Sequence, residues 1–495
     1  MQNTIKKVVV LGGGTAGWLS AALLQKIIGP SISIELVESE DIGIVGVGEA
    51  TIPPIRHVNQ VLGIPEHEFL KQTKATAKLA IRFEGWLREG ESYYHTFGAP
   101  GKSMAFCHFH HFWQRARSLG HNSDLWSYDL NYLAAEAGKF APINSKDSII
   151  ELPFAYHFDA ALYARYLRSI SEQLGVTRTE GIVEQVQTHE DGSIQSLQLK
   201  DGKVIEGDFF IDCSGFRALL IQQKLGVGYD DWSHLLPCDS AIAVPSERHE
   251  KTAPFTRSIA RPAGWQWRIP LQHRNGNGHV FCSRYMSEDE ATHTLMSNLD
   301  TQPIGEPRTV KFTTGRRRKQ WHKNVVAVGL SSGFLEPLES TSIHLIQSAI
   351  TRLAQYFPHD GVKSAAVAEY NQQSETEYLQ IRDFLILHYI ANERKGMRFW
   401  DDIRELQVPS SLTHKMALFE QTGKLDREGN DLFLESSWLQ VLLGQGVEPK
   451  DYHPIANGMS KEQLIQMLES IQKVKQEPIA KLPTHDDYIN GMCAR

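Results

Sequence analysis

The sequence predicts an α/β fold with a doubly wound core that is interrupted by inserted strands and followed by a mainly helical C-terminal region. Three short apolar runs each end in a turn of glycine and serine residues. They predict buried parallel strands at residues 5–11, 209–212 and 324–330. Farther along the chain the apolar residues recur at helical spacing in five segments, which are 345–357, 365–395, 410–422, 434–443 and 461–474.

From this pattern we expect two regions. Residues 1–91 and 150–350 are predicted to form the discontinuous core, and residues 92–149 and 351–495 to form the second, mainly helical region. We expect a further helix near residues 66–80 and a loose tail over the last fifteen residues.

Composition and charge exclude several classes of protein. The chain has 495 residues and 51 Lys plus Arg against 58 Asp plus Glu, so it offers no electrostatic footprint for nucleic acid. The one dense basic run, residues 316–319, is expected to be a solvated loop. Five cysteines without paired spacing fit a reducing compartment, and no apolar run approaches the roughly 18 residues that cross a bilayer. We therefore expect a cytoplasmic protein without nucleic-acid or membrane partners.

The clearest motif is a glycine-rich turn, residues 12–17, between the first predicted strand and a helix. Its spacing is GxGxxG: Gly12 allows the tight turn, Gly14 lets the backbone approach a pyrophosphate, and Gly17 lets helix and strand pack closely. The helix N-terminus attracts phosphate, and Glu38 at the end of the second strand can accept both hydroxyls of a ribose. This context predicts a dinucleotide site; the alternative is a glycine-rich turn without a ligand.

A second motif, at residues 264–270, indicates which class of dinucleotide-binding protein the chain resembles. Residues 264–270, GWQWRIP, match the WxWxIP signature of flavin-dependent halogenases, and the chain resembles the tryptophan halogenases among them. Other pieces follow in the family's order, namely residues 12–18, 46–53, Lys78, 94–98, 212–217 and 336–341. The resemblance runs to about residue 350 and continues more loosely to about 455. It implies an FAD-binding core of the glutathione-reductase and monooxygenase type.

The resemblance also implies a reaction. In that family reduced FAD, oxygen and chloride or bromide yield hypohalous acid, which travels through a tunnel to a lysine beside an electron-rich aromatic substrate. Lys78 resembles that lysine, and Glu339 resembles its carboxylate partner, which orients the amine and takes the proton lost from the ring. Because the chain has no second GxGxxG for NAD(P)H, we expect a separate flavin reductase to supply FADH2, with halide as co-substrate.

The remaining site residues are likewise implied by the family. The cofactor-binding set is Gly12, Gly14, Thr15, Ala16, Gly17, Glu38, Glu49, Ala50, Asp212, Gly329 and Leu330. Thr341 and Ser342, at the start of a predicted helix, would bind halide through backbone N–H groups. The family usually has glycine where this chain has Ser342. His95, Phe97 and Phe433 would stack on the substrate, and Trp265 and Trp267 would form a wall on the flavin side.

Several of these residues also have an alternative, purely structural interpretation. Lys78 could be a solvated helix lysine, Glu339 a first-turn helix residue, and His95 a buried histidine bonded to backbone. Two tryptophans two residues apart are also ordinary core packing. The run of one cysteine and three histidines in residues 107–113 suggests zinc, but no second Cys/His pair closes a site, so we expect no metal.

The substrate end departs from the tryptophan halogenases. An approximate alignment through residues 442–446 puts Gln421 and Thr422 where the family carries paired tyrosines, and Glu428 near a glutamate position. Phe433 falls near an indole-stacking tryptophan. An incomplete clamp for the amino acid's ammonium and carboxylate favours a bare or differently substituted indole over free tryptophan.

Two other functions compete with halogenation. One is an FAD-dependent aromatic monooxygenase that hydroxylates its substrate at the peroxyflavin; the other is a flavin-binding protein without turnover. The monooxygenase hypothesis explains the N-terminal motif but not Trp265, Trp267, Lys78 or Glu339. Halide preference, regiochemistry and oligomeric state, including a homodimer, stay open.

Overall fold

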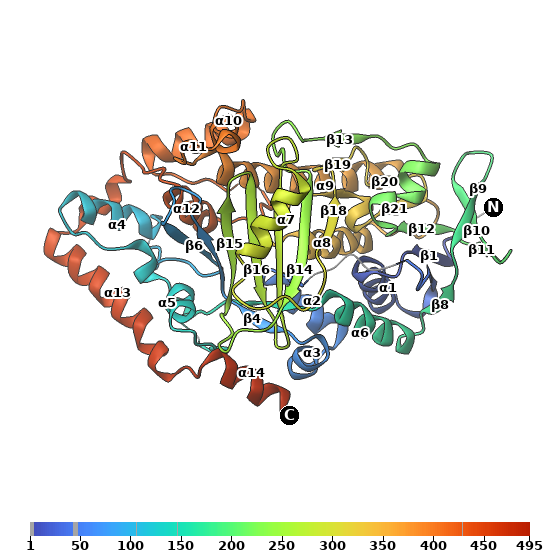
Figure 1. The fold of residues 1–495 in the computed structure, drawn as a ribbon, viewed down its shortest axis with the longest axis horizontal. Helices are drawn as coiled ribbons and strands as arrows, with labels where there is room; N and C mark the ends of the chain where they lie inside the picture. Colours follow the sequence, from blue (N-terminus) through green and yellow to red (C-terminus); the bar gives the residue numbers. More distant parts are fainter. Residues whose placement is uncertain (1–3, 43–47, 105, 146, 428) are drawn as a thin grey trace. The chain divides into compact units, whose positions relative to one another are not determined.

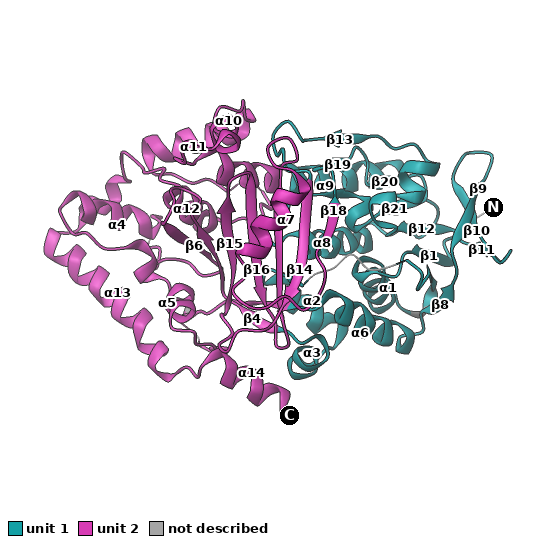
Figure 2. Ribbon diagram, viewed as in Figure 1, with its two compact units in different colours: residues 1–75, 158–239, 311–379 teal, residues 76–157, 240–310, 380–495 magenta. Residues whose placement is uncertain are grey.

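The computed structural model describes residues 4–42, 48–104, 106–145, 147–427 and 429–495. Its contacts divide the chain into two compact units, each assembled from three segments (Figure 2). Unit 1 comprises Met1–Ala75, Phe158–Asp239 and Lys311–Leu379, and unit 2 comprises Thr76–His157, Ser240–Val310 and Gln380–Arg495. The organisation is thus discontinuous.

The unit boundaries differ from the expected domain limits. Residues 76–91 and 240–310, expected in the core, belong to unit 2, and residues 351–379 belong to unit 1. The reason is strand pairing: Ala80–Glu84 pairs with Phe255–Arg261 in one large sheet, so that unit 2 is not mainly helical.

Unit 1 is built on a six-stranded sheet in the order β20-β21-β12-β1-β2-β8. Its strands are β1 Lys7–Leu11, β2 Ser33–Glu38, β8 Thr177–Glu180, β12 Phe209–Asp212, β20 Trp321–His322 and β21 Val325–Ala327. All neighbours from β21 to β8 pair in parallel. The chain passes from β1 to β2 on one side and returns to β12 on the other. The carboxyl end of β1 is therefore the point where the strand order switches, which is where doubly wound sheets bind their ligands.

Helices and smaller sheets complete unit 1 (Figure 1). Helix α1, Thr15–Ile28, packs against α6, Ala160–Gln173, and α8, Ser342–Gln355. The other elements are α2 Pro54–Leu62, α3 Glu66–Thr73, β3 Glu49–Ala50, an antiparallel sheet of β9 Val183–Thr188, β10 Ile194–Leu199 and β11 Val204–Glu206, and a sheet of β13 Tyr229–Asp231, β19 Gly315–Arg317 and β22 Gly333–Phe334. Val9, Leu11 and Phe210 on the main sheet share a buried core with Leu197 and Ile221.

Unit 2 is built on a seven-stranded sheet in the order β18-β14-β17-β16-β15-β5-β6. Its strands are β5 Ala80–Glu84, β6 Ser92–Thr96, β14 Ser240–Ser246, β15 Phe255–Arg261, β16 Gly264–Pro270, β17 Asn275–Phe281 and β18 Arg308–Lys311. A separate short strand, β4 Thr76–Lys78, pairs antiparallel with β7 Ala155–Phe158.

The helices of unit 2 lie mostly near the C-terminus of the chain. They are α4 Phe109–Ser118, α5 Leu130–Glu136, α7 Glu288–Ser297, α10 Arg398–Arg404, α11 Ser410–Thr422, α12 Glu435–Gly444, α13 Lys461–Lys481 and α14 His485–Cys493. Helix α9, Ser364–Ile390, runs from unit 1 into unit 2. In the part of the chain that the structure describes, no helix is long and apolar enough to cross a membrane.

Three expectations about local structure are wrong. The helix near 66–80 ends at Thr73, because Lys74 adopts a left-handed conformation with φ 52°, and residues 76–78 form strand β4. The last fifteen residues are not a loose tail, since α14 occupies most of them. The basic run is a solvated segment only in its second half: Arg318 and Lys319 are exposed, but Arg316 and Arg317 are buried, and Arg316 pairs with Asp230 and Glu375.

Candidate flavin, halide and substrate sites

The glycine-rich turn of unit 1 is shaped by close backbone approach. A Cβ on Gly12 (φ 120°) would lie 2.3 Å from the carbonyl oxygen of Cys213, and a Cβ on Gly17 would lie 1.8 Å from that of Gly12. A Cβ on Gly14, by contrast, would meet no atom of the described residues within 4 Å. Gly14 is the N-cap of α1, and no side chain in the described part of the chain caps the helix. The turn therefore packs tightly against the backbone at Gly12 and Gly17. The first N–H groups of α1 have no capping side chain among the described residues, and such N–H groups can bind a phosphate.

Two further strand-end turns meet the glycine-rich turn. The amide of Cys213 donates to the Leu11 carbonyl at 2.9 Å, and that of Val328 donates to the Asp212 carbonyl at 2.9 Å. A Cβ on Gly329 (φ 72°) would lie 2.8 Å from Cβ of Ala16. The ends of β1, β12 and β21 thus meet at one edge of the sheet, which is the edge where doubly wound sheets bind their ligands.

The carboxylate of Asp212 accepts its hydrogen bonds from groups of the protein. Its buried carboxylate accepts from the amide and hydroxyl of Ser214, at 3.0 and 2.6 Å, and from the amides of Leu220 and Ile221, at 2.8 and 2.9 Å. The side chain therefore fixes the turn after β12. A role of Asp212 in FAD binding would be indirect, through this turn.

The acidic residues of the predicted cofactor set lie in different surroundings. Glu38 ends β2, where its carboxylate occupies the space above Gly13 and accepts from Nε of Arg178 at 2.7 Å. Burial, aided by the nearby carboxylate of Asp159, raises the pKa of Glu49 to about 7. Ala50 and Thr15 are buried, whereas Leu330 is half-buried. Gly46 and Val47 lie outside the described residues.

The predicted halide residues lie at the N-terminus of α8. Ser340, in the left-handed conformation (φ 60°), ends a short turn, Pro337–Glu339, and the helix begins at Ser342. The hydroxyl of Thr341 is buried yet makes no hydrogen bond to any residue in the described part of the chain. Glu339 is 1% exposed in the turn just before it. A buried hydroxyl beside the amides of a helix N-terminus supplies donors suited to a small anion.

In unit 2, Lys78 is fully buried. It is the last residue of β4, opposite Ala155 of β7, and its exposed fraction is 0%. Its Nζ lies 5.2 Å from the centre of the Phe97 ring, within the range of a cation–π contact. A lysine is seldom buried without a reason, because removing an ammonium group from water costs several kcal/mol. Burial excludes the solvated-lysine interpretation.

Aromatic rings gather near the strand that carries His95. His95 on β6 is 5% exposed and lies edge-on to Phe384, with ring centres 5.6 Å apart. Phe384 in turn stacks on Phe433 at 3.9 Å and meets Trp438 edge-on at 4.9 Å. His95, Phe97 and Phe433 therefore all belong to one unit. Phe384 and Trp438 were not among the predicted residues, because in the sequence they are ordinary apolar positions of helices.

The GWQWRIP segment forms β16 in the middle of the large sheet. Trp265 and Trp267 lie on one face, with ring centres 6.0 Å apart, and both are buried. The ring of Trp267 rests on Gly278 of the neighbouring strand, where a Cβ would lie 2.0 Å from the indole. Its Nε1 makes no hydrogen bond within the described residues.

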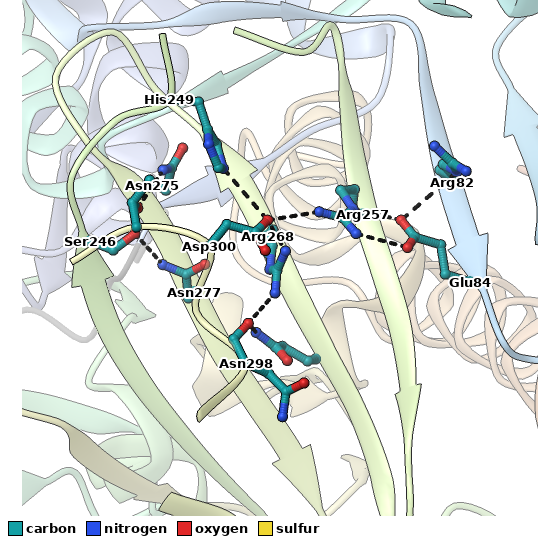
Figure 3. A network of polar contacts seen from close by, with 12 residues as sticks. Arg82, Glu84, Ser246, His249, Arg257, Arg268, Asn275, Asn277, Asn298 and Asp300 are labelled. Atoms are coloured by element: carbon teal, nitrogen blue, oxygen red, sulfur yellow. Dashed lines mark hydrogen bonds and ion pairs between the residues drawn. The ribbon is translucent and has the colours of Figure 1, made fainter. Parts of the chain in front are cut away.

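The opposite face of β16 is polar (Figure 3). Arg268 is directed to Asp300 and to the carbonyl of Asn298, and Arg257 links Asp300, at 2.9 Å, to Glu84, at 2.6 Å. These ion pairs join three strands to the chain after α7. Because side chains alternate along β16, the two indoles lie on one face of the strand, and the ion pairs on the other face hold the strand in place.

The histidine-rich segment is engaged within the protein. Nε2 of His110 donates to the Gly423 carbonyl at 2.7 Å, and Nδ1 of His111 accepts from the amide of His453 at 3.2 Å. Burial lowers the pKa of His110 to about 4 and that of His111 to about 3. Among the described residues, no group of three or more His, Cys, Asp or Glu side chains could hold a metal.

Comparison with known proteins identifies the family. A model of the family described as tryptophan halogenase matches residues 7–461. The chain belongs to the tryptophan halogenase family. It is 47% identical to a flavin-dependent halogenase from Xanthomonas campestris, with a TM-score of 0.97 and 99% of both chains covered.

Two further relatives agree. A flavin-dependent halogenase from Brevundimonas sp. BAL3 is 41% identical, with a TM-score of 0.95 and 99% of both chains covered. Tryptophan 7-halogenase RebH from Lentzea aerocolonigenes is 32% identical over 100% of both chains. The protein is therefore an enzyme, a flavin-dependent halogenase that uses FADH2, oxygen and halide, and the predicted fold class is confirmed. The monooxygenase alternative is not favoured.

The residues of unit 1 fit FAD. The open space over Gly14 and the uncapped start of α1 suit the pyrophosphate, with Thr15, Ala16, Gly329 and Leu330 around the same edge of the sheet. Glu38 keeps a carboxylate at the end of β2, where a ribose would lie.

The halogenase's Gly14→Ala variant is expected to fold and to bind FAD about tenfold more weakly. The new methyl group meets no atom of the residues that the structure describes, but it occupies the space through which the backbone would approach the pyrophosphate. Fluorescence titration measures FAD affinity, and thermal unfolding of the FAD-free protein measures stability. Gly17→Ala is the control for packing: it should unfold the protein, because its Cβ would overlap the Gly12 carbonyl. Unchanged FAD affinity in Gly14→Ala would contradict the assignment.

The halogenase's Thr341→Val variant is expected to raise the KM for bromide about fivefold. Valine keeps the shape of the side chain and removes the buried hydroxyl that has no protein partner within the described residues. Steady-state rates at varied bromide provide the measurement. The KM for the aromatic substrate should not change, and a parallel rise in both constants would show a general distortion instead of a halide contact.

Proposed function

We propose that this halogenase transfers chlorine or bromine to a bare or differently substituted indole, or to a similar electron-rich aromatic, at a site formed by Lys78. The observation that carries the proposal is the burial of the Lys78 ammonium beside the Phe97 ring in a unit rich in aromatic side chains. Such an ammonium hydrogen-bonds hypohalous acid and makes its halogen more electrophilic, or forms a haloamine.

The proposed roles follow from each group's chemistry. Reduced FAD with oxygen supplies the oxidising equivalent that turns halide into hypohalous acid. Thr341 and the amides at the start of α8 would hold the halide, and Lys78 would present the halogen to the ring. Glu339 would orient the amine and take the ring proton, so that halogen replaces hydrogen and water is released. Trp265 and Trp267 would keep the organic substrate from the flavin.

The proposed substrate differs from that named for the tryptophan halogenases. Phe384, Phe433 and His95 offer ring faces and edges suited to an indole. Gln421 and Thr422 stand where the family's paired tyrosines are expected, and Glu428 lies outside the described residues. Without those partners the site selects weakly for an amino acid's polar groups.

Two partners belong to the proposal. A separate reductase would supply FADH2, since the one glycine-rich dinucleotide motif is assigned to FAD. A homodimer and a cytoplasmic location stay predictions, to be tested by light scattering and by fractionation.

Mass spectrometry tests the function directly. Indole, 3-substituted indoles and tryptophan are each incubated with enzyme, flavin reductase, FAD, NADH and bromide. A product with a bromine isotope doublet, formed faster from an indole without the amino-acid group than from tryptophan, is expected. A product heavier by one oxygen would instead show hydroxylation, and preferential turnover of tryptophan would overturn the proposed substrate class.

A further inference from the structure

Two buried histidines flank the short strand that carries Lys78. Both His157, on β7, and His485, the first residue of α14, have an exposed fraction of 0%. The amide of Ala77, directly before Lys78, donates to Nε2 of His485 at 3.0 Å. Two residues farther along, the amide of Leu79 donates to the Pro254 carbonyl at 2.8 Å. Alternate amides of a strand point to the same side, so the amides of Ala77 and Leu79 both point away from β7. On that side the Leu79 amide is bonded to the Pro254 carbonyl, and the Ala77 amide is bonded to the His485 ring.

The hydrogen bonds fix the tautomers of both rings. The Thr76 hydroxyl donates to the Pro270 carbonyl at 2.7 Å, so its oxygen accepts from Nδ1 of His157 at 3.1 Å. Nε2 of His157 then accepts from the Thr256 hydroxyl at 2.8 Å. In His485, Nε2 accepts, so Nδ1 carries the proton and donates to the Thr252 carbonyl at 2.9 Å. Each ring is neutral and uses both nitrogens.

Neutrality is required by the surroundings of the strand. Burial, and after it the charge of Lys78, lowers the pKa of His157 well below its usual value. Burial likewise lowers the pKa of His485 to about 4, against the opposing effects of the Thr252 carbonyl and Asp486. A protonated His485 could not accept the Ala77 amide. The strand is therefore held by uncharged acceptors, and neither histidine adds a positive charge beside Lys78.

We propose that His485, through its hydrogen bond to the Ala77 amide, is a positioning residue that sets the direction of Lys78, so that the C-terminal helix α14 takes part in the halogenation step. The proposal rests on the function proposed for Lys78. Strand β4 is three residues long and pairs with one strand, β7, so we expect loss of the His485 bond to shift Ala77 and, with it, the Lys78 side chain. Misplacement of a reacting group by about 1 Å can cost a hundredfold in rate.

The test separates positioning from folding by choice of variant. His485→Asn keeps a donor for the Thr252 carbonyl and loses the reach to the Ala77 amide, whereas His485→Gln carries an acceptor at the position of Nε2. Asp486→Asn is the matched control: Asp486 binds Arg248 and the Thr252 amide and so holds the same helix without touching β4. The readout is halogenated indole formed per FADH2 oxidised, with FAD affinity and thermal unfolding recorded for each variant.

We expect His485→Asn to lower the product per FADH2 about tenfold, His485→Gln to stay within about threefold of the parent, and Asp486→Asn to match the parent. FADH2 oxidation and FAD affinity should not change in any of them. A folded His485→Asn with the parent's yield, or an equal loss in Asp486→Asn, would overturn the proposal. Lys78→Met in the same assay tests the underlying function: if it halogenates normally, the role of Lys78 fails, whereas if only His485→Asn is normal, the positioning role alone fails.

Discussion

Lys78→Ala is expected to lower ring halogenation by at least about a hundredfold while FADH2 oxidation continues at the parent rate. The ammonium is the buried cation beside Phe97, and removing a charged donor from a water-excluded site commonly costs 10²–10³ in rate. We expect flavin oxidation to depend on unit 1, which carries the turns proposed to bind FAD, and so to be unaffected. Product is measured by liquid chromatography and mass spectrometry, and FADH2 oxidation by absorbance under single turnover.

A second variant guards against loss of packing. Lys78→Met fills the space of the long side chain and removes only the amine, so it should fold well and be as inactive as Lys78→Ala. Lys78→Arg keeps a positive charge but replaces the compact ammonium with a planar group, and should recover little activity. Product formed at the parent rate by either uncharged variant would remove Lys78 from the mechanism.

The parts of the fold that the sequence could predict are those dictated by local spacing. The turn at Gly12, Gly14 and Gly17 was predictable from its spacing. At Gly12 and Gly17 the structure shows the steric reason, because a Cβ there would lie less than 2.5 Å from a carbonyl oxygen, whereas at Gly14 the predicted reason is the approach of a pyrophosphate. Three of the five helices predicted after residue 345 were predictable within a few residues, since their apolar faces repeat at helical period. The other two end elsewhere, α9 at Ile390 instead of 395 and α13 at Lys481 instead of 474. Helix α11, Ser410–Thr422, matches its predicted limits.

The parts that the sequence could not predict depend on contacts between distant segments. Lys78 was expected near the end of a helix, but Lys74 ends α3 and the chain enters β4, whose partner β7 lies about 80 residues away in the sequence. Arg316 and Arg317 belong to a basic run in the sequence, yet both are buried in a paired strand, and Arg316 has acidic partners there. No local sequence pattern predicts such pairing, because the tertiary fold determines which distant segment lies beside each strand.

The same limit applies to the substrate end. His95, Phe97 and Phe433 were predicted from the resemblance alone, and the structure shows them buried or half-buried within unit 2. Phe384, Trp438 and His485 could not be recognised, because each is a single residue of a helix whose role depends on which strand or ring it contacts. A histidine that caps a strand edge has no signature in the sequence.

Glu339→Gln is expected to lower the halogenation rate about a hundredfold while FAD affinity stays unchanged. The glutamine keeps the size of the side chain and removes the negative charge, so it can neither orient an ammonium by charge nor take the proton that leaves the halogenated ring. Glu339 is 1% exposed at the end of the turn Pro337–Glu339, so its carboxylate is shielded from water, which strengthens both effects. Glu336→Gln is the matched control, because Glu336 is a buried carboxylate of the same segment. An equal loss in both variants, or parent activity in Glu339→Gln, would assign Glu339 to the structure of the turn. A loss confined to Glu339→Gln, in which product per FADH2 falls and flavin oxidation stays intact, would establish its carboxylate as the acid–base partner of the lysine.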